Sequence, residues 1–282
     1  MSIVVTGATG HLGRLIVTSL LDRGVPAEQI VALGRDTGRL ADLADRGVTV
    51  RQADYNVADS LRAAFAGAEK LMFVSGTELG QRAAQARTVV AAATEAGVGL
   101  VVYTSIPKAD TSSLTLAVEH RATEQEIAAS GLPYVFLRNS WYFENYLPQI
   151  PTYLEHGVIG AAGDGRISAA GRADYAEAAA TVLTTEGHAG KVYELGGAPF
   201  TMAELAGELS RQTGRDVTYT DLPVEKYVEV LVGTGMPEQM AAVLADGDRG
   251  VAAGELEVPG DDLERLIGRK PTSLAEAIRA AL

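Results

Sequence analysis

Three glycines, Gly7, Gly10 and Gly13, lie three residues apart between an apolar run and a helical segment. Gly7 permits a tight turn, Gly10 lets the main chain come close to a pyrophosphate, and Gly13 allows the helix to pack closely on the strand. The helix N-terminus adds unpaired N–H groups that attract an anion. The spacing is GxxGxxG rather than GxGxxG, and an ordinary turn also uses glycine. Because five further alternations of strand and helix follow, we interpret the segment as a dinucleotide-binding loop.

A cation follows the second apolar run, where Arg35 comes directly after Gly34. An arginine at this place pairs with the 2′-phosphate of NADP, whereas enzymes that use NAD place a carboxylate there for the ribose hydroxyls. Arg39 is a candidate for a second donor. The alternative is a solvated arginine, since Asp36 follows at once. The pattern favours NADPH as the cofactor.

Short apolar runs that alternate with helix-length segments must position these residues. Such runs are typical of strands buried on both faces of a parallel, doubly wound sheet, which places the chain in the α/β class. The predicted strands are residues 3–6, 30–33, 48–51, 71–74, 100–104 and 134–137.

The pattern changes after residue 140. We expect a hairpin at 160–167, a helix at 173–185, a strand at 191–195 that returns to the sheet, and a helix at 201–212. Thr201 and Glu204 have the spacing of a capping box. Residues 246–262 are rich in Gly and Asp and predict a long surface loop. A smaller lobe, discontinuous in sequence, is therefore expected.

Aromatic residues cluster at Trp141, Tyr142 and Phe143, directly after the sixth predicted strand. Open α/β sheets bind ligands at this edge, and aromatic rings suit the stacking of a planar acceptor. The alternative is an apolar core between the lobes. Candidate substrate-binding residues are Asn139, Trp141, Tyr142 and Asn145.

The segment TGATGHLG at residues 6–13 resembles the signature of atypical short-chain dehydrogenases/reductases of the NmrA-like branch. The similarity extends nearly from end to end, through VRQADY at 50–55, YTS at 103–105, LRNSWYFEN at 137–145, RADY at 172–175 and KVYEL at 191–195. Together these segments resemble bacterial NADPH-dependent quinone oxidoreductases of type 2. The resemblance implies a Rossmann domain at 1–140 with a return segment at 170–197, and a smaller substrate-binding lobe at 141–169 and 198–282.

The resemblance also implies the residues that bind the cofactor. The pyrophosphate is expected on Gly7, Thr9, Gly10, His11 and Leu12. The adenine is expected near Asp54 and Tyr55, and the ribose beside Ser75 and Gly76. The nicotinamide is expected beside Tyr103, Thr104 and Ser105.

The residues for proton transfer depart from the usual pattern. Most short-chain dehydrogenases carry Tyr-x-x-x-Lys, in which the lysine lowers the tyrosine pKa for proton exchange with a carbonyl or an alcohol. No tyrosine of this chain has a lysine four residues later, and by the register of Glu124 the expected lysine position is His120. His120 either contacts the ribose, relays a proton or is a satisfied helical histidine. The candidate catalytic residues are His120, Tyr103 and Ser105.

A quinone acceptor suits such a site, because hydride transfer to it leaves the charge on a delocalised phenolate that needs little acid assistance. Catalysis then depends mainly on positioning the nicotinamide against the acceptor. We expect an NADPH-dependent oxidoreductase that acts on a quinone or a similar conjugated acceptor. One alternative is a non-catalytic NADP(H)-sensing regulator of the NmrA type, and another is a reductase of a specialised substrate such as a dye.

Composition excludes several other functions. The formal net charge is −12 and no cluster of Lys and Arg opposes it, so nucleic acid is not an expected partner. Cysteine is absent, which excludes disulfides and thiolate chemistry and suits a reducing cytoplasm. His120 and Glu124 are too few for a metal site, and no apolar run reaches membrane-spanning length. We expect a soluble, cytoplasmic protein without a metal, and the sequence leaves self-association open.

Overall fold

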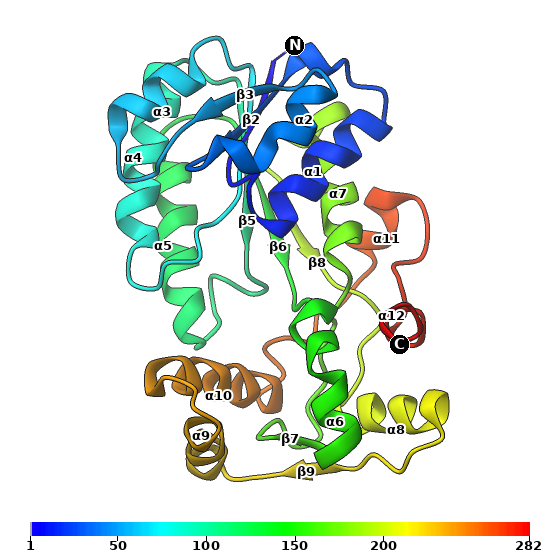
Figure 1. Ribbon diagram of the computed structural model, residues 1–282. Helices are drawn as coiled ribbons and strands as arrows, with labels where there is room; N and C mark the ends of the chain where they lie inside the picture. Colours follow the sequence, from blue (N-terminus) through cyan, green and yellow to red (C-terminus); the bar gives the residue numbers. More distant parts are fainter. Residues whose placement is uncertain (1) are drawn as a thin grey trace.

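Seven parallel strands form the central sheet of the computed structural model, which describes residues 2–282 (Figure 1). Their order is β3-β2-β1-β4-β5-β6-β8. The strands are β1 (Ile3–Val5), β2 (Ile30–Gly34), β3 (Thr49–Gln52), β4 (Lys70–Phe73), β5 (Leu100–Ser105), β6 (Tyr134–Asn139) and β8 (Val192–Leu195). In β1, Val4 pairs with Val31 on one side and with Leu71 on the other, so the strand order reverses beside β1. This arrangement confirms the predicted α/β class with a doubly wound parallel sheet.

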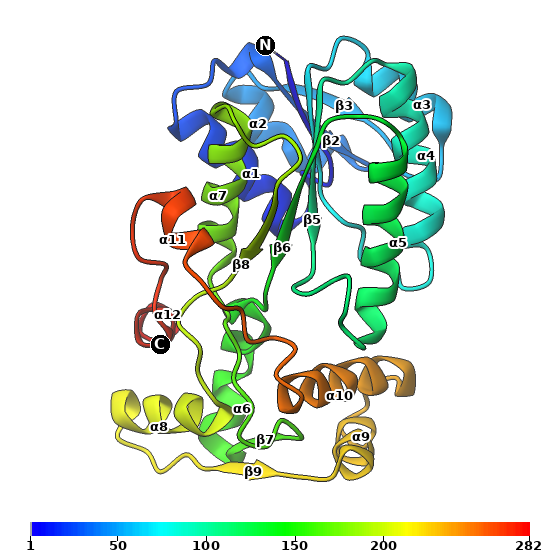
Figure 2. The same ribbon diagram turned by 180° about the vertical axis from the view of Figure 1, so that it is seen from behind.

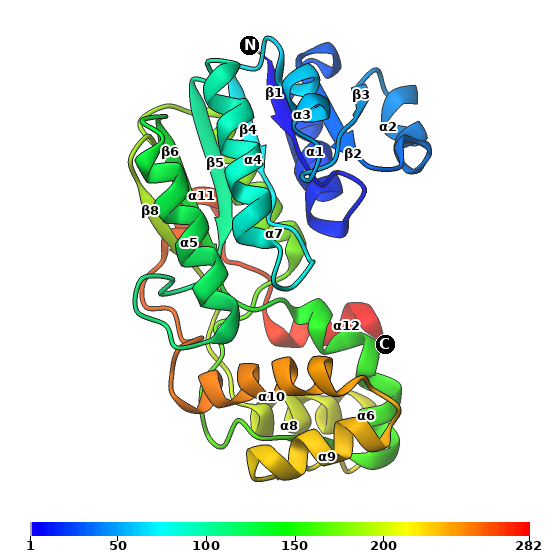
Figure 3. The ribbon, with the colours of Figure 1, turned by 90° about the vertical axis from the view of Figure 1, so that its left-hand side faces the viewer.

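Helices cover both faces of the sheet (Figure 3). One face carries α1 (His11–Asp22), α7 (Arg172–Thr184) and α11 (Asp262–Ile267), and the other carries α3 (Ala58–Phe65), α4 (Arg82–Glu95) and α5 (Thr115–Ala129). Near β2 and β3 lie η1 (Ala27–Gln29), η2 (Thr37–Leu40) and α2 (Ala41–Asp45). Ile16 and Tyr175 are buried on the first face, while Phe65 and Tyr103 are buried on the second. Because both faces are covered, β1, β2 and β5 are buried along their whole length, whereas the edge strand β3 keeps exposed residues.

A second group of elements lies beyond the carboxyl ends of β5, β6 and β8 (Figure 2). It contains η3 (Phe143–Asn145), η4 (Leu147–Gln149), α6 (Ile150–His156), α8 (Met202–Thr213), α9 (Val224–Gly233), α10 (Glu238–Ala252) and α12 (Leu274–Ala281). Two short strands, β7 (Val158–Gly160) and β9 (Tyr219–Asp221), pair in parallel. The predicted capping box is confirmed, since the Thr201 hydroxyl accepts from the main-chain N–H of Glu204 and the Glu204 carboxylate accepts from that of Thr201. No helix within residues 2–282 combines the length and the apolar character that crossing a bilayer requires.

The predicted hairpin at 160–167 is wrong. Its first strand pairs with β9, some sixty residues later in the chain, and Ile167 instead forms an antiparallel bridge with Phe200. Gly163 has a φ of +56° and turns the chain between these two pairings. Turn residues between two apolar stretches predicted a local pairing, but each stretch has a distant partner.

The predicted surface loop at 246–262 is also wrong, because α10 continues to Ala252 and several later residues are buried. Two of its glycines allow close packing: a Cβ on Gly250 would lie 2.4 Å from the Leu114 side chain, and Gly247 faces Trp141. Asp246 accepts a hydrogen bond of 2.8 Å from the main-chain N–H of Thr115, at the start of α5. The Gly and Asp residues that predicted a loop therefore serve helix packing and helix capping.

Candidate functional site

A cavity of about 610 Å³ opens at the carboxyl ends of the strands, beside the reversal of strand order at β1. Doubly wound sheets bind ligands at this place. Its walls come from the glycine loop after β1, the ends of β2 and β3, the β4–α4 connection, and the ends of β5 and β6. The predicted residues that line it are Gly7, Thr9, Gly10, His11, Leu12, Arg35, Asp54, Tyr55, Ser75, Gly76, Ser105, His120, Asn139, Trp141, Tyr142 and Asn145.

The glycine loop is a tight turn that leads into α1. Gly7 has a φ of +62°, which favours glycine, and its carbonyl accepts a hydrogen bond of 2.9 Å from the N–H of Gly10. A Cβ on Gly13 would lie only 2.4 Å from the same carbonyl, so the helix could not begin this close to the strand with any larger residue. Gly10 is the N-cap of α1 and brings no side chain to its first turn. Residues of that turn line the cavity, and unpaired N–H groups at a helix N-terminus favour an anion.

The far end of the cavity lies between β2 and β3. Arg35 lines it there and also lines a neighbouring hollow of about 310 Å³ with Gln52, Asp54 and Ser60. The Gln52 side chain donates to the main-chain carbonyl of Arg35 at 2.9 Å, which fixes the backbone from which the guanidinium extends. The Asp54 carboxylate accepts from the N–H of Asn56 at 2.8 Å, so it shapes its own turn beside the cavity.

Tyr55 joins three of the loops that form the cavity. Its hydroxyl donates to the carbonyl of Val74 at 2.7 Å and lies 2.6 Å from the Thr6 hydroxyl. Burial raises the pKa of Tyr55 well above its usual range, so the hydroxyl keeps its proton as a donor. The segments after β1, β3 and β4 are thereby held at fixed distances from one another.

The end of β5 brings Ser105 to the cavity and α5 brings His120, while Tyr103 and Thr104 lie behind the wall. Tyr103 is only 1% exposed, and its hydroxyl shares a hydrogen bond of 2.8 Å with His120 Nδ1. The Thr104 hydroxyl accepts from the N–H of Ser75 at 2.9 Å and so positions the next loop. Both side chains support cavity residues and do not line the cavity themselves.

His120 is an uncharged imidazole at neutral pH. Burial, and next the positive charge of Arg82, lower the pKa of His120 to about 3. A neutral imidazole carries one N–H and one acceptor nitrogen, so the bond between Tyr103 and Nδ1 leaves Nε2 for the cavity. His120 can thus donate or accept one hydrogen bond there, but it is not a cationic acid.

Several cavity residues were not among the predicted site residues, and four of these carry charged or amide side chains: Glu78, Arg82, Gln85 and Arg172. The Arg82 guanidinium donates to the carbonyl of Gly76 at 2.6 Å and forms an ion pair of 3.2 Å with Glu119. Glu78, Arg82 and Gln85 follow β4, and their position after a parallel strand was the signal that could have identified them.

Three buried polar atoms of the cavity wall have no hydrogen-bond partner within residues 2–282: Gln85 Oε1, Ser105 Oγ and Asn139 Oδ1. Each of these side chains is at least 94% buried. Burying such an atom without a partner costs about 1–3 kcal/mol. The atoms are therefore well suited to a ligand that supplies donors and acceptors.

Aromatic side chains form the wall beyond β6. The Tyr142 ring packs edge-on against Tyr175 at 5.4 Å, and the Arg172 guanidinium lies 4.7 Å from the centre of the Tyr142 ring. Trp141 also lines the cavity. Phe143 does not, because it is 2% exposed and stacks on Phe200. Trp141 and Tyr142 are thus part of the cavity wall, whereas Phe143 is part of the core, so both interpretations of the aromatic cluster hold in part.

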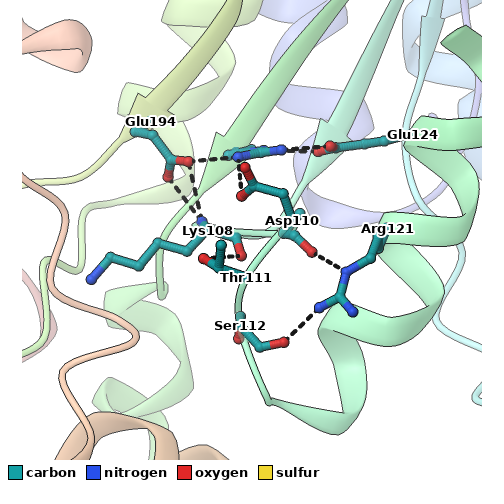
Figure 4. A network of polar contacts seen from close by, with 9 residues as sticks. Lys108, Asp110, Thr111, Ser112, Arg121, Glu124 and Glu194 are labelled. Atoms are coloured by element: carbon teal, nitrogen blue, oxygen red, sulfur yellow. Dashed lines mark hydrogen bonds and ion pairs between the residues drawn. The ribbon is translucent and has the colours of Figure 1, made fainter.

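A buried ion network supports the end of β5 (Figure 4). Arg138 on β6 makes hydrogen bonds of 3.0 and 2.7 Å to the two oxygens of Glu124 and ion pairs of 2.9 and 3.0 Å with Asp110 and Glu194. Glu194 also accepts from the N–H of Lys108. The network joins β6, β8, α5 and the loop that follows Ser105, and so holds that edge of the cavity in place.

The model of the NmrA-like family matches residues 1–278. The chain belongs to the NmrA-like family. This confirms the resemblance seen in the sequence. The chain is 50% identical to quinone oxidoreductase 2 of Escherichia coli over 278 residues, which covers 98% of this chain and 97% of the relative.

Two solved structures superpose closely on the chain. The NADPH-dependent quinone oxidoreductase of Escherichia coli, complexed with NADPH, matches with a TM-score of 0.96 and 48% identity over 99% of both chains. A Citrobacter triphenylmethane reductase complexed with NADP(H) matches with a TM-score of 0.95 and 41% identity over the full length of both chains. The NmrA-like chain thus shares its whole architecture with two reductases that bind the same cofactor.

Proposed function

We propose that this NmrA-like protein is an NADPH-dependent reductase that transfers hydride to a quinone or a similar conjugated acceptor. The observation that carries the proposal is the continuity of one cavity from the anion site of α1 to the aromatic wall at Trp141 and Tyr142. A dinucleotide and a planar acceptor can therefore lie in contact. The identity to quinone oxidoreductase 2 along nearly the whole chain supports an enzyme rather than a sensor.

The residues of the cavity fit NADPH. The first turn of α1 and the glycine loop would hold the pyrophosphate through Gly7, Thr9, Gly10, His11 and Leu12. Arg35 would hold the 2′-phosphate, Asp54 and Tyr55 would lie by the adenine, and Ser75 and Gly76 by the ribose. The unpartnered atoms of Gln85, Ser105 and Asn139 provide hydrogen-bonding groups for the remainder of the cofactor or for the acceptor.

NADPH supplies the hydride when it is bound. The chain's own residues orient the reactants: Trp141 and Tyr142 offer flat apolar surface to the acceptor, and Asn139 and Asn145 offer polar groups beside it. His120, as an uncharged imidazole, can hydrogen-bond an acceptor oxygen through Nε2 without delivering a proton. The delocalised phenolate of the reduced quinone is a weak base, so its formation needs no acid in the site, and it takes its proton from water afterwards.

We propose that the two parts of the chain have the separate binding roles that the resemblance implies. Residues 1–140 and 170–197 would bind the dinucleotide, and residues 141–169 and 198–282 would complete the acceptor site. The separate apolar core of the second group, which contains Phe143, Ile150 and Phe200, supports this division. The absence of cysteine suits the cytoplasm.

The proposal is tested by mixing the purified protein with NADPH and a panel of quinones and following the absorbance of the reduced nicotinamide. Triphenylmethane and azo dyes belong in the panel, because relatives act on such compounds. We expect turnover with simple quinones. Tight binding of NADPH without turnover of any acceptor would instead identify a cofactor sensor. An Arg35→Glu variant that keeps its preference for NADPH over NADH would refute the assignment of the 2′-phosphate site.

A further inference from the structure

An ion pair spans the dinucleotide end of the cavity. Arg35 follows β2, and Glu78 lies in the connection between β4 and α4; their side chains meet at 2.7 Å. In the sheet, β1 lies between β2 and β4. The pair therefore links the two neighbours of β1 across the end where the glycine loop begins. Both residues line the cavity.

Glu78 is held at both of its carboxylate oxygens. Oε1 accepts from Arg35, and Oε2 accepts a hydrogen bond of 3.0 Å from Gln85 Nε2. Gln85 is 96% buried at the start of α4, and its own Oε1 packs against Gly76 and has no partner within the described part of the chain. The carboxylate is thus fixed in place by one exposed cation and one buried amide.

This arrangement bears on the cofactor because the 2′-phosphate of NADPH needs the same guanidinium. A phosphate dianion beside Arg35 would lie next to the Glu78 carboxylate, and two like charges at such a distance repel. NADH has a neutral 2′-hydroxyl in place of that phosphate, so it does not compete with Glu78 for the guanidinium.

We propose that Glu78 is a specificity-determining residue: an internal anion that occupies Arg35 until the 2′-phosphate displaces it. This rests on the proposed use of NADPH. Glu78 weakens the binding of NADPH but not that of NADH, and so reduces the preference for NADPH that Arg35 alone would give. It also favours release of NADP⁺, because the carboxylate pairs with the Arg35 guanidinium again when the 2′-phosphate leaves. The size of the effect follows from exposure. The Arg35 and Glu78 side chains are 65% and 37% exposed, so their pairing should change affinity by no more than about fivefold.

The test is calorimetric titration of the wild type, Glu78→Gln, Arg35→Gln and the double variant with NADPH and NADH. Adenosine 2′,5′-bisphosphate and 5′-AMP serve as fragments that isolate the 2′-phosphate. Glu78→Gln should tighten binding of NADPH and adenosine 2′,5′-bisphosphate, which carry the 2′-phosphate, by about three- to fivefold and leave the affinities for NADH and 5′-AMP within about twofold. In the Arg35→Gln background the same change should have less than about a twofold effect. Asp45→Asn, an exposed position on α2 outside the cavity, is the matched charge control and should leave all four affinities unchanged.

The other possible results would each contradict one step of the proposal for Glu78. Equal changes for NADPH and NADH would refute the role in specificity. A tightening that persists without Arg35 would show general electrostatic repulsion in place of competition for the guanidinium. Weaker binding of NADH by Glu78→Gln would show that the carboxylate receives the ribose hydroxyls. A wild type that binds no NADPH would overturn the proposed function itself. Normal binding of NADPH by the wild type, with the same preference for NADPH over NADH in Glu78→Gln, would refute only the role of Glu78.

Discussion

The neutrality of buried His120 predicts a specific dependence of stability on pH. An exposed histidine in the unfolded chain has a pKa of about 6.5, whereas burial and Arg82 lower the pKa of His120 to about 3 in the folded protein. Below pH 6.5 the unfolded chain therefore binds a proton that the folded chain does not, and stability falls as the pH is lowered toward 3. Linkage gives a loss of about 2 kcal/mol between pH 7 and pH 5 from this group alone.

The assay compares urea unfolding of the wild type and of His120→Gln at pH 7, 6 and 5. Glutamine can still hydrogen-bond the Tyr103 hydroxyl but does not titrate. The free energy of unfolding of the wild type should fall by about 2 kcal/mol more than that of the variant over this interval. Other titrating groups, such as the half-buried Asp248, are common to both proteins and cancel in the difference. Identical pH dependence of the two proteins would refute the assignment of His120 as a neutral, desolvated imidazole.

Two further substitutions test the glycine loop and the ion network. Gly13→Ala places a Cβ 2.4 Å from the carbonyl of Gly7, so we expect calorimetry to show loss of NADPH binding together with about 1–3 kcal/mol of destabilisation. Gly207→Ala in α8, where the added Cβ meets nothing within 4 Å, is the control and should be neutral or stabilising by up to about 1 kcal/mol; equal behaviour of the two variants would contradict the steric argument. Arg138→Met leaves the buried carboxylate of Glu124 without its cation and should cost about 3–5 kcal/mol in urea unfolding. A loss below about 1 kcal/mol would show that the network contributes little.

The glycine loop and the strands were predictable because their signals are local. Gly7 needs a left-handed backbone and Gly13 a missing side chain, and both requirements appear directly as residue types. The face toward which a strand residue points was not predictable, since strands buried on both faces are apolar throughout. The resemblance placed Tyr103 beside the nicotinamide, whereas its ring points into the core beside Phe73 and Phe136.

The missed cavity residues depend on contacts between distant segments. Gln85 lies in a helix, and only the packing of α4 against the sheet turns it toward Gly76 and Glu78. Glu78 appears in the sequence as one of many charged residues in loops, and its significance arises from Arg35, forty-three residues earlier. The periodicity of apolar residues in the sequence does not indicate a pairing between two charged residues so far apart. The same limit explains the wrong hairpin at 160–167, whose partners lie far away in the chain.

The protonation states in the cavity also restrict the class of acceptor. Reduction of a simple ketone makes a strongly basic alkoxide, which needs an acid at the reacting oxygen. The usual lysine position holds His120, whose lowered pKa leaves the cationic form nearly absent at neutral pH. Burial raises the pKa of Tyr142, so this hydroxyl is a hydrogen-bond donor but a poor acid. A site that offers neutral donors and flat aromatic surface stabilises an anion already spread over a conjugated ring, and this requirement, rather than the shape of the cavity alone, favours quinones over alcohols and ketones.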